Sequence, residues 1–567
     1  MNFIKRNWQT ISLVFIGLIV IITRLVPISL GDLYGDNAIN SFRAYGWFDY
    51  LGTSGQSVPF EWLGFVPAWG NLSFHDAPPL TFLIQHIFFV FFGGNVVVAR
   101  LPFVLAGVAS IFLVYFLLKK ITNQRVAVWA TIIYAVSSYS AWASQAAYLE
   151  GIEEFFIVAS MLSGAYYLFK DQKKKFLFLW AIFTACAILT KYTALFLLPP
   201  IVIYAFLYRK TLKPQWRNVL LAVIIFVILL SPVIIYNINV YQLRGHFDAA
   251  LSSIVGMHPE DYWIISNRSA SFNIFPNIQS GFNILKSNIS FPLLILFFIC
   301  LLVSISQIRK KGWRSFESMV LINFFFLVLM FGFSGPTTRF LSILVPFIVL
   351  ITALTIPIIF SWLKNKPSLY LTSSVLVVII ILFEGFYSFN TNVLKNPIGK
   401  ADWLYSGNKV QNLGFNQLDN FIRDNVIVSL PPKVGIKTKN DISFTNEDFT
   451  NRSVIIIDDR INWFAQMWYF QRYFLYHRWP YFSTSYLSDR NPNRFTIKDL
   501  LNASGKPLYF IYPINQSVID PTRAVDKNLN SIGPALSANL DKSSTQFTII
   551  ENSLGTPAFK VYRIDRI

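Results

Sequence analysis

The sequence predicts a polytopic α-helical membrane protein that carries a smaller α/β domain at its C-terminus, and three observations support this. Of 567 residues, 54% are hydrophobic and only 14% are charged, and the mean hydropathy is +0.48. A soluble protein of this composition would expose far too much apolar surface. Long apolar runs continue to residue 390, and beyond it Asn, Asp, Lys, Ser and Pro become frequent.

About eleven apolar runs precede residue 390, most of them long enough to cross the hydrocarbon core of a bilayer. They cover 11–30, 97–118, 126–142, 147–169, 176–190, 193–208, 217–237, 289–306, 317–333, 338–361 and 367–388. The first run has no small-residue cleavage site, which predicts an uncleaved first helix. A shorter run, 79–92, follows a Pro-Pro pair, and we expect it to form an interfacial or re-entrant helix.

The distribution of basic residues predicts the orientation. If the run 79–92 does not cross the membrane, the short Lys/Arg-rich loops all fall on one side, which the positive-inside rule makes cytoplasmic. These loops are 119–125, 170–175, 208–217, 307–314 and 364–366. The N-terminus would then be cytoplasmic, and the C-terminal domain would lie outside the plasma membrane. The net charge of +19 fits cytoplasmic basic clusters near anionic lipids and does not require nucleic acid.

We predict two domains. Residues 1–390 form the transmembrane domain, which includes two outer loops, 31–96 and 238–288. Residues 391–567 form the α/β domain, with strand-like runs at 453–457, 507–512, 547–551 and 559–564 and an aromatic helix at 461–476. This second domain has no phosphate-binding glycine loop, metal-ligand spacing or nucleophile motif, which favours a structural or acceptor-docking role.

The first outer loop contains the leading candidate for catalysis. Asp36 begins a helix-length segment, 36–51, in which apolar residues are interspersed among polar ones. This pattern suggests a helix that lies in the membrane surface. The simplest interpretation of Asp36 is an N-cap carboxylate. The functional interpretation is a general base that deprotonates an acceptor hydroxyl. The same loop ends in His75-Asp76-Ala77-Pro78-Pro79, so His75 and Asp76 are further candidates.

Charged residues also stand at the predicted outer ends of four spans: Arg100, Glu150, Lys191 and Arg339. Charges at these depths are costly unless they pair or bind something. Snorkelling or plain ion pairing would explain each one alone. Together with a base they favour a cavity that handles phosphate, because Lys and Arg suit that ligand.

This ordered set of residues resembles the GT-C superfamily of protein O-mannosyltransferases and lipid A aminoarabinose transferases, over residues 10–390. The shared features are an Asp in the first outer loop, a Pro-Pro-Leu before a short helix, Arg-x-Pro opening the second span, an acid opening the fourth, Leu-Thr-Lys at 189–191, and Arg-Phe followed by Pro at 339–346. Two positions differ from the common family pattern, Asn37 in place of Glu and Ala77 in place of Lys or His. The Trp-Trp-Asp pattern of oligosaccharyltransferases and an Asp-x-Asp in the first loop are absent, which disfavours the metal-dependent, lipid-diphosphate branch.

The resemblance implies a GT-C fold and an enzyme that moves a monosaccharide, with inversion, from a polyprenyl phosphate to an extracytoplasmic hydroxyl. The acceptor would belong to a protein, a lipid or a cell-wall glycan, and no metal or other cofactor is implied. Asp36 would be the base, Glu150 a second acid, and Arg100, Lys191 and Arg339 would surround the lipid phosphate. Two alternatives remain open. One is a polymerase or ligase of lipid-linked glycans. The other is a lipid or glycan transporter, although no inverted repeat or matched pair of interrupted helices supports it.

Overall fold

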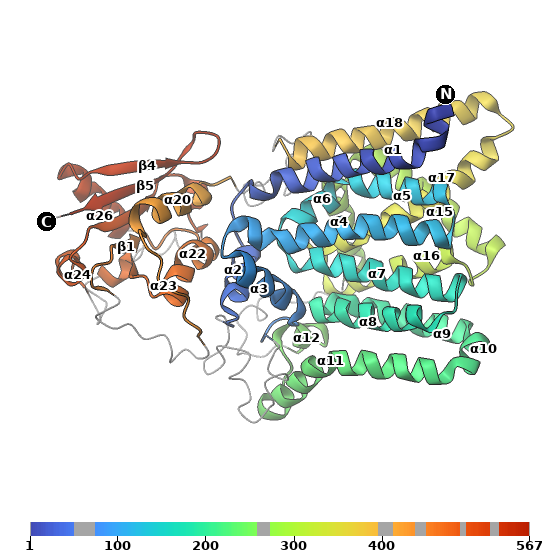
Figure 1. The fold of residues 1–567 in the computed structure, drawn as a ribbon, viewed down its shortest axis with the longest axis horizontal. Helices are drawn as coiled ribbons and strands as arrows, with labels where there is room; N and C mark the ends of the chain where they lie inside the picture. The colour runs from blue at the N-terminus through green and yellow to red at the C-terminus, as the bar shows by residue number, and fades with distance from the viewer. Residues whose placement is uncertain are drawn as a thin grey trace. The chain divides into compact units, whose positions relative to one another are not determined.

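The chain forms two compact units in a computed structural model, which describes residues 2–49, 74–257, 273–394, 412–436, 449–487, 495–521 and 532–565 (Figure 1). The helical unit contains Met1–Ile28, Leu51–Phe88 and Val97–Tyr405. The sheet unit contains Ser29–Tyr50, Phe89–Val96 and Ser406–Ile567, and therefore includes the beginning of the first outer loop. Parts of both predicted outer loops, 50–73 and 258–272, lie outside the described residues.

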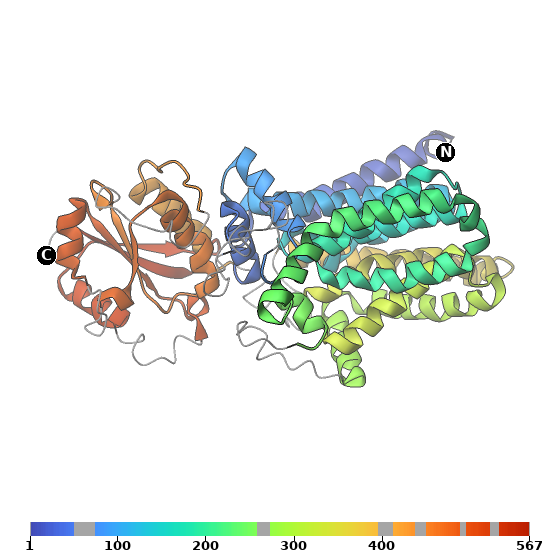
Figure 2. The ribbon, with the colours of Figure 1, turned by 90° about the horizontal axis from the view of Figure 1, so that it is seen from below.

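The helical unit is a bundle of long apolar helices that run side by side (Figures 1 and 2). The long helices and the two halves of a broken one are α1 (Asn2–Val20), α4 (Val96–Ile121), α5 (Gln124–Val136), α6 (Ser138–Gln145), α7 (Leu149–Phe169), α8 (Lys174–Thr190), α9 (Leu198–Leu207), α11 (Trp216–Arg244), α15 (Phe291–Lys311), α16 (Phe316–Ser334), α17 (Val345–Leu363) and α18 (Pro367–Asn392). Each predicted apolar run lies on one of these helices or on helices that follow one another directly.

Seven helices within the described ranges are long and apolar enough to cross a membrane, or eight if α5 and α6, bent by 60°, form one span. This confirms the prediction of a polytopic membrane protein. Three apolar helical segments, Leu13–Ser29, Leu80–Phe92 and Tyr192–Leu207, are shorter than the others. The number of about eleven spans therefore stays a prediction. The run at 79–92 forms the 13-residue helix α3 (Leu80–Phe92), and its position in a membrane also stays a prediction.

Shorter helices connect the long ones at both ends of the bundle. Beside α3, these are α10 (Arg209–Leu212), α12 (Ala249–Ile254), α14 (Ile274–Asn288) and the 3₁₀ segments η3 (Tyr192–Leu197) and η5 (Phe340–Leu344). The basic segments 170–175 and 208–217 follow the C-terminal ends of α7 and α9. The N-terminus of α7 lies at the opposite end of the bundle from these basic turns (Figure 1).

The described residues of the sheet unit form a five-stranded sheet in the order β2-β1-β3-β5-β4. The strands are β1 (Val454–Ile457), β2 (Tyr481–Ser483), β3 (Leu508–Pro513), β4 (Phe547–Glu551) and β5 (Pro557–Ile564). The first three are parallel, with Ile455 opposite both Tyr481 and Tyr509, and β5 is antiparallel to its neighbours on both sides. The predicted α/β domain is confirmed, and four of its five strands coincide with the strand-like runs of the sequence.

Helices cover both faces of this sheet (Figure 2). On one face, α24 (Ile497–Ser504) and α26 (Ile532–Lys542) bury Leu500 and Leu540 against Val454, Phe510 and Tyr562. On the other face, α20 (Phe415–Phe421) packs the ring of its first residue on Phe559, with the centroids 5.0 Å apart. Phe559 and Tyr562 are both buried and stand three positions apart on β5, so they point to opposite faces, because successive side chains of a strand alternate between the faces.

The predicted aromatic helix at 461–476 is present as three consecutive segments: α22 (Trp463–Gln466), the π-helical η8 (Met467–Gln471) and α23 (Arg472–His477). They pack against α2 (Asp36–Gly46) within the sheet unit. All residues from Asn37 to Tyr45 are buried. The structure therefore differs from the predicted helix in the membrane surface, because α2 is buried and its Phe42 and Tyr45 pack against the ring of Tyr476 in α23.

Candidate active site

Three of the predicted site residues meet at one end of the helical unit. Glu150 lies in the first turn of α7, Lys191 is the C-cap of α8, and Arg339 precedes η5. The Lys191 ammonium donates to Glu150 Oε1, and Arg339 Nε lies 3.8 Å from the same oxygen. Only 2% of the Glu150 side chain is exposed, against 15% for Lys191 and 25% for Arg339. Two cations from distant parts of the sequence thus share one buried carboxylate.

Local sequence explains why the two cations point into this region. Helix α8 ends where Lys191 adopts an extended backbone, with φ at −162° and ψ at 139°. Helix α16 ends at Gly335, whose φ of 79° lies in the left-handed region that favours glycine, and Pro336 prevents the helix from continuing. The chain then turns back into η5, which places Arg339 at the start of a new segment.

Aromatic rings pack against the two cations of this cluster. The Lys191 ammonium lies 3.4 Å from the centroid of the Phe340 ring, and the Arg339 guanidinium lies 5.0 Å from it. Arg339 also lies 5.8 Å from the centroid of Tyr148. Contacts of this kind attract a cation to the face of an aromatic ring. Both cations therefore contact an aromatic ring as well as the Glu150 carboxylate.

A second acid, Glu153, extends the cluster. Its Oε1 accepts a hydrogen bond from the Thr193 hydroxyl, and its side chain is fully buried. The remaining oxygens, Oε2 of Glu150 and Oε2 of Glu153, are buried without a hydrogen-bond partner in the described part of the chain. Unsatisfied buried carboxylate oxygens are rare and require an explanation. Each of these two oxygens could accept a further hydrogen bond.

A buried polar network lies directly beside Lys191. The Tyr192 hydroxyl donates to Asp248 Oδ2 over 2.5 Å, and Asn237 Nδ2 donates to the same oxygen over 3.0 Å. Asp248 also caps α12 through Leu251 N, at 2.7 Å. Burial raises the pKa of Asp248 to about 6. The sequence analysis did not identify Asp248, although an Asp just before a short helix in the second outer loop is a recognisable N-cap signal.

The other two candidates of the first loop, His75 and Asp76, also belong to the helical unit. His75 is buried and its carbonyl accepts a hydrogen bond from Ala249 N, at 2.7 Å, so it lies beside α12. Its Nδ1 lies 3.8 Å from the carboxylate of Asp76. The charge of Asp76 contributes to the raised pKa of Asp248. These two residues therefore lie near Asp248 and extend the polar region of this end of the bundle.

The environment of Arg100 differs from that of Lys191 and Arg339, the other two predicted phosphate ligands. It lies in the first turns of α4, is 4% exposed, and its Nη1 donates to the carbonyl of Ile28 over 3.0 Å. The Glu150 cluster thus contains two of the three predicted cations. The expectation that a donor phosphate is their shared ligand stays a prediction, and the structure shows Glu150 as their shared protein partner.

Sequence analysis also missed a buried cation in the first span. Arg24 donates to the carbonyls of Tyr134 and Ala135, at 3.1 and 2.8 Å, and to the hydroxyl of Ser140. The Tyr134 hydroxyl in turn donates to Glu154 over 2.5 Å. An Arg inside the apolar run 11–30 was the available signal, because charges inside spans usually find partners.

Asp36 is the first residue of α2 in the sheet unit. The preceding Gly35 is the N-cap, with φ at 83°, so the simple interpretation of Asp36 as an N-cap does not hold. The next residue, Asn37, accepts a hydrogen bond from Tyr34 N through Oδ1, at 2.9 Å. Asp36 itself is half-buried. The Asp36 carboxylate therefore lies at the start of α2, directly after a glycine with a positive φ.

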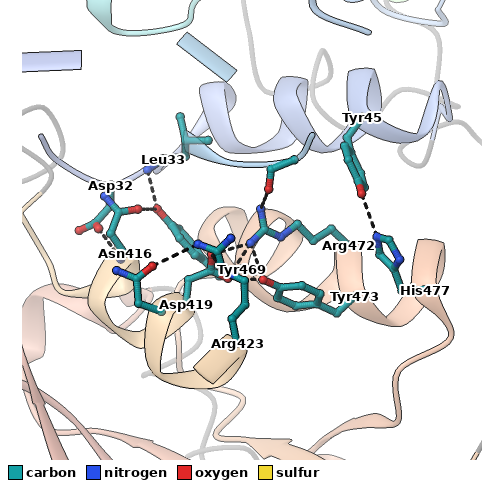
Figure 3. A network of polar contacts seen from close by, with 12 residues as sticks. Asp32, Leu33, Tyr45, Asn416, Asp419, Arg423, Tyr469, Arg472, Tyr473 and His477 are labelled. Carbon is teal, nitrogen blue, oxygen red and sulfur yellow. Dashed lines mark hydrogen bonds and ion pairs between the residues drawn. The ribbon is translucent and has the colours of Figure 1, made fainter. Parts of the chain in front are cut away.

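Polar contacts within the sheet unit join α23 to α20, to Gly94 and to α2 (Figure 3). Arg472 Nη2 donates to both oxygens of Asp419 over 2.6 Å, and Arg472 Nη1 donates to the carbonyl of Gly94 over 2.9 Å. Burial opposes the charge of Arg472, but the carboxylate of Asp419 outweighs it and the pKa of Arg472 is raised. His477 Nε2 lies 2.8 Å from the Tyr45 hydroxyl, which ties α23 to α2.

Comparison with known proteins concerns the fold of the chain. A protein-family profile described as dolichyl-phosphate-mannose-protein mannosyltransferase matches residues 76–236. No curated protein sequence matches the chain as a relative. Among solved structures, ArnT from Cupriavidus metallidurans in the apo state is 12% identical with a TM-score of 0.51, and the match covers 99% of this chain and 98% of that one.

Two further solved structures are similar over most of the chain. ArnT bound to undecaprenyl phosphate is also 12% identical with a TM-score of 0.51, over 98% of both chains. The oligosaccharyltransferase AglB from Archaeoglobus fulgidus, in complex with an inhibitory peptide and a dolichol-phosphate, is 13% identical with a TM-score of 0.51, over 98% of this chain and 74% of that one. The profile matches less than half of the chain, and these structural likenesses show that the chain has the GT-C fold.

Proposed function

We propose that the protein transfers a monosaccharide from a polyprenyl-phosphate donor to an extracytoplasmic hydroxyl acceptor, with inversion at the anomeric carbon. The observation that carries the proposal is the convergence of Lys191 and Arg339 on one buried carboxylate, Glu150. The GT-C fold adds weight, because the similar ArnT structure is described as bound to undecaprenyl phosphate.

On the donor side, Lys191 and Arg339 bind the phosphate. The leaving group gains negative charge as the bond between the anomeric carbon and the phosphate oxygen breaks, and fixed cations stabilise this charge most effectively in a site with little water. Arg339 offers a planar set of N–H donors, and Lys191 offers a compact charge. Glu150 keeps both cations in place when no donor is bound. Arg100 supports the first turns of α4 through Ile28.

On the acceptor side, Asp36 acts as the general base. Its carboxylate removes the proton from the acceptor hydroxyl while the hydroxyl oxygen forms a new bond to the anomeric carbon. The donor phosphate leaves with the electron pair of the broken bond. Attack from the face opposite the phosphate inverts the configuration. The reaction yields a glycosylated acceptor, a polyprenyl monophosphate and one proton held by Asp36. The glycosylated acceptor and the polyprenyl monophosphate are the two products that a reconstituted transfer assay would detect.

The charges of the helical unit orient it in the membrane. The basic turns 170–175 and 208–217 lie at the opposite end of the bundle from Glu150, and we propose that their end is cytoplasmic. The Glu150 cluster is then at the outer surface, where a lipid carries the activated sugar because nucleotide sugars are absent.

Cysteine labelling tests this orientation. In a variant that lacks Cys186 and Cys300, a membrane-impermeant maleimide applied to intact cells should label a cysteine at Ser544, which is exposed in the sheet unit. It should label a cysteine at Lys173 only after the cells are permeabilised. Labelling at position 173 in intact cells would show that the proposed orientation is wrong.

A further inference from the structure

The segment that directly precedes Asp36 is held by residues from the C-terminal part of the sheet unit (Figure 3). Asp32 is 1% exposed, and its carboxylate accepts three backbone hydrogen bonds. Oδ2 accepts from Leu413 N at 2.6 Å and from Gly414 N at 3.1 Å, and Oδ1 accepts from Asn416 N at 2.7 Å. Both oxygens are therefore engaged, and each faces a donor.

A side-chain bridge strengthens the same connection. Asn416 Nδ2 donates to the carbonyl of Gly31 over 2.7 Å, and Asn416 Oδ1 accepts from the Tyr469 hydroxyl over 2.7 Å. The Tyr469 oxygen in turn accepts from Leu33 N over 2.9 Å. The backbone on both sides of Asp32 is thus fixed by groups that belong to α20 and η8.

The geometry of the following residues transmits this constraint to Asp36. Tyr34 N is bonded to the side chain of Asn37, and Gly35 has a φ of 83°, a conformation that residues with a side chain rarely adopt. The chain therefore enters α2 through one defined turn. Asp36 follows Asp32 by four positions. A displacement of the Asp32 segment would therefore also displace the first turn of α2.

We propose that Asp32 is a positioning residue for Asp36, and that the C-terminal part of the sheet unit fixes the place of the base. This inference rests on the proposed role of Asp36. The chemistry requires a carboxylate at position 32, because three N–H donors face its two oxygens. An amide of the same shape would direct an NH₂ group at some of these donors, which leaves them unsatisfied. The C-terminal part of the sheet unit then contributes to catalysis through the position of Asp36, without itself touching donor or acceptor.

A purely structural role for Asp32 makes a different prediction. Loss of a buried hydrogen-bonding group would reduce the fraction of folded protein but leave the turnover of each folded molecule unchanged. Asp459 provides a matched control in the same unit. It is 6% exposed, follows β1, and accepts hydrogen bonds from Ser485 N at 2.5 Å and from the Thr484 hydroxyl at 2.8 Å. Its partners belong to the turn after β2 and not to α2.

The experiment compares Asp32→Asn, Tyr469→Phe and Asp459→Asn in the full-length protein reconstituted in liposomes. Thermal unfolding gives the folded fraction, and initial rates give kcat per folded molecule and KM for a polyprenyl-phosphate sugar. We expect kcat of Asp32→Asn to fall by about tenfold or more with KM changed by less than about twofold, because small displacements of a catalytic group reduce rate strongly. Tyr469→Phe should show a smaller loss of kcat in the same direction, and Asp459→Asn should keep kcat.

Each outcome decides between the two roles. If Asp32→Asn and Asp459→Asn lose the same amount of folded protein and both keep the kcat of the wild type, Asp32 is structural and the inference is wrong. If Asp32→Asn fails to fold, Tyr469→Phe decides, because it removes one hydroxyl and keeps the ring stacked on Phe415. The proposed function is separable from this inference, since its failure would appear as normal turnover in Asp36→Asn.

Discussion

Replacement of Asp36 by Asn should leave the protein folded and lower its turnover by about two or more orders of magnitude. General bases contribute about 10²- to 10⁴-fold to reactions of this kind. The amide has nearly the shape of the carboxylate but cannot accept a proton from the acceptor hydroxyl. Asp36 is half-buried at the first position of α2, so the substitution removes no core packing. The measurement is kcat for sugar transfer by purified protein in liposomes.

Asp499 supplies the control for loss of an acid near a helix N-terminus. It lies in the first turn of α24, in the same unit, where its carboxylate and Thr496 form a capping box. Removal of an acid from such a position costs about 0.3–1 kcal/mol of stability. Asp499→Asn should therefore resemble Asp36→Asn in stability and retain the turnover of the wild type. Wild-type turnover in Asp36→Asn would remove Asp36 from the mechanism.

Neutral substitution of Lys191 should reduce kcat/KM by about 10²- to 10³-fold, the range measured for loss of one group that stabilises a developing negative charge. Lys191→Met keeps the length and apolar stem of the side chain, so packing against Phe340 is preserved. The control is Lys173→Met, which removes a cation that is 66% exposed on the same helical hairpin and pairs with Asp171. It should have the kcat/KM of the wild type.

The shared carboxylate allows a sharper test of the role of Lys191. If Lys191 serves only to neutralise Glu150, the double variant Lys191→Met with Glu150→Gln should recover activity, because the buried charge is then absent. If Lys191 binds the donor phosphate, the double variant should be no more active than Lys191→Met. Such a double-mutant cycle isolates the coupling between neighbouring groups. Recovery of activity would show that the cluster is structural.

Much of the fold could be predicted from local sequence. Apolar runs long enough to span a bilayer identify the helices of the bundle, and short β-branched and aromatic runs identify β1, β3, β4 and β5. Strand β2 (Tyr481–Ser483) has only three residues, which are too few for this pattern to identify it. The strand order could not be predicted, because it depends on pairings such as Ile455 with Tyr509 across a long stretch of sequence.

The candidate site was predictable only in part, for similar reasons. Charged residues at the ends of apolar runs are conspicuous in sequence, so Glu150, Lys191 and Arg339 could be identified, and ion pairing was one of the explanations that the sequence left open for them. Asp32 carried no such signal. Its partners are backbone amides, which every residue has, and the nearest is that of Leu413, 381 residues later. Asp248 was missed because its importance depends on Tyr192 and Asn237, which only the fold brings to it.

The products of a single transfer reaction test the central claim most directly. Purified protein in liposomes would receive polyprenyl-phosphate sugars, radiolabelled in the sugar, and an extract of cell-envelope acceptors. Thin-layer chromatography and mass spectrometry would then identify the lipid that remains. The account predicts one polyprenyl monophosphate released for each sugar transferred, and loss of both products in Asp36→Asn and Lys191→Met. Release of a polyprenyl diphosphate from lipid-linked glycans, or movement of intact donor lipid across the bilayer without cleavage, would contradict it.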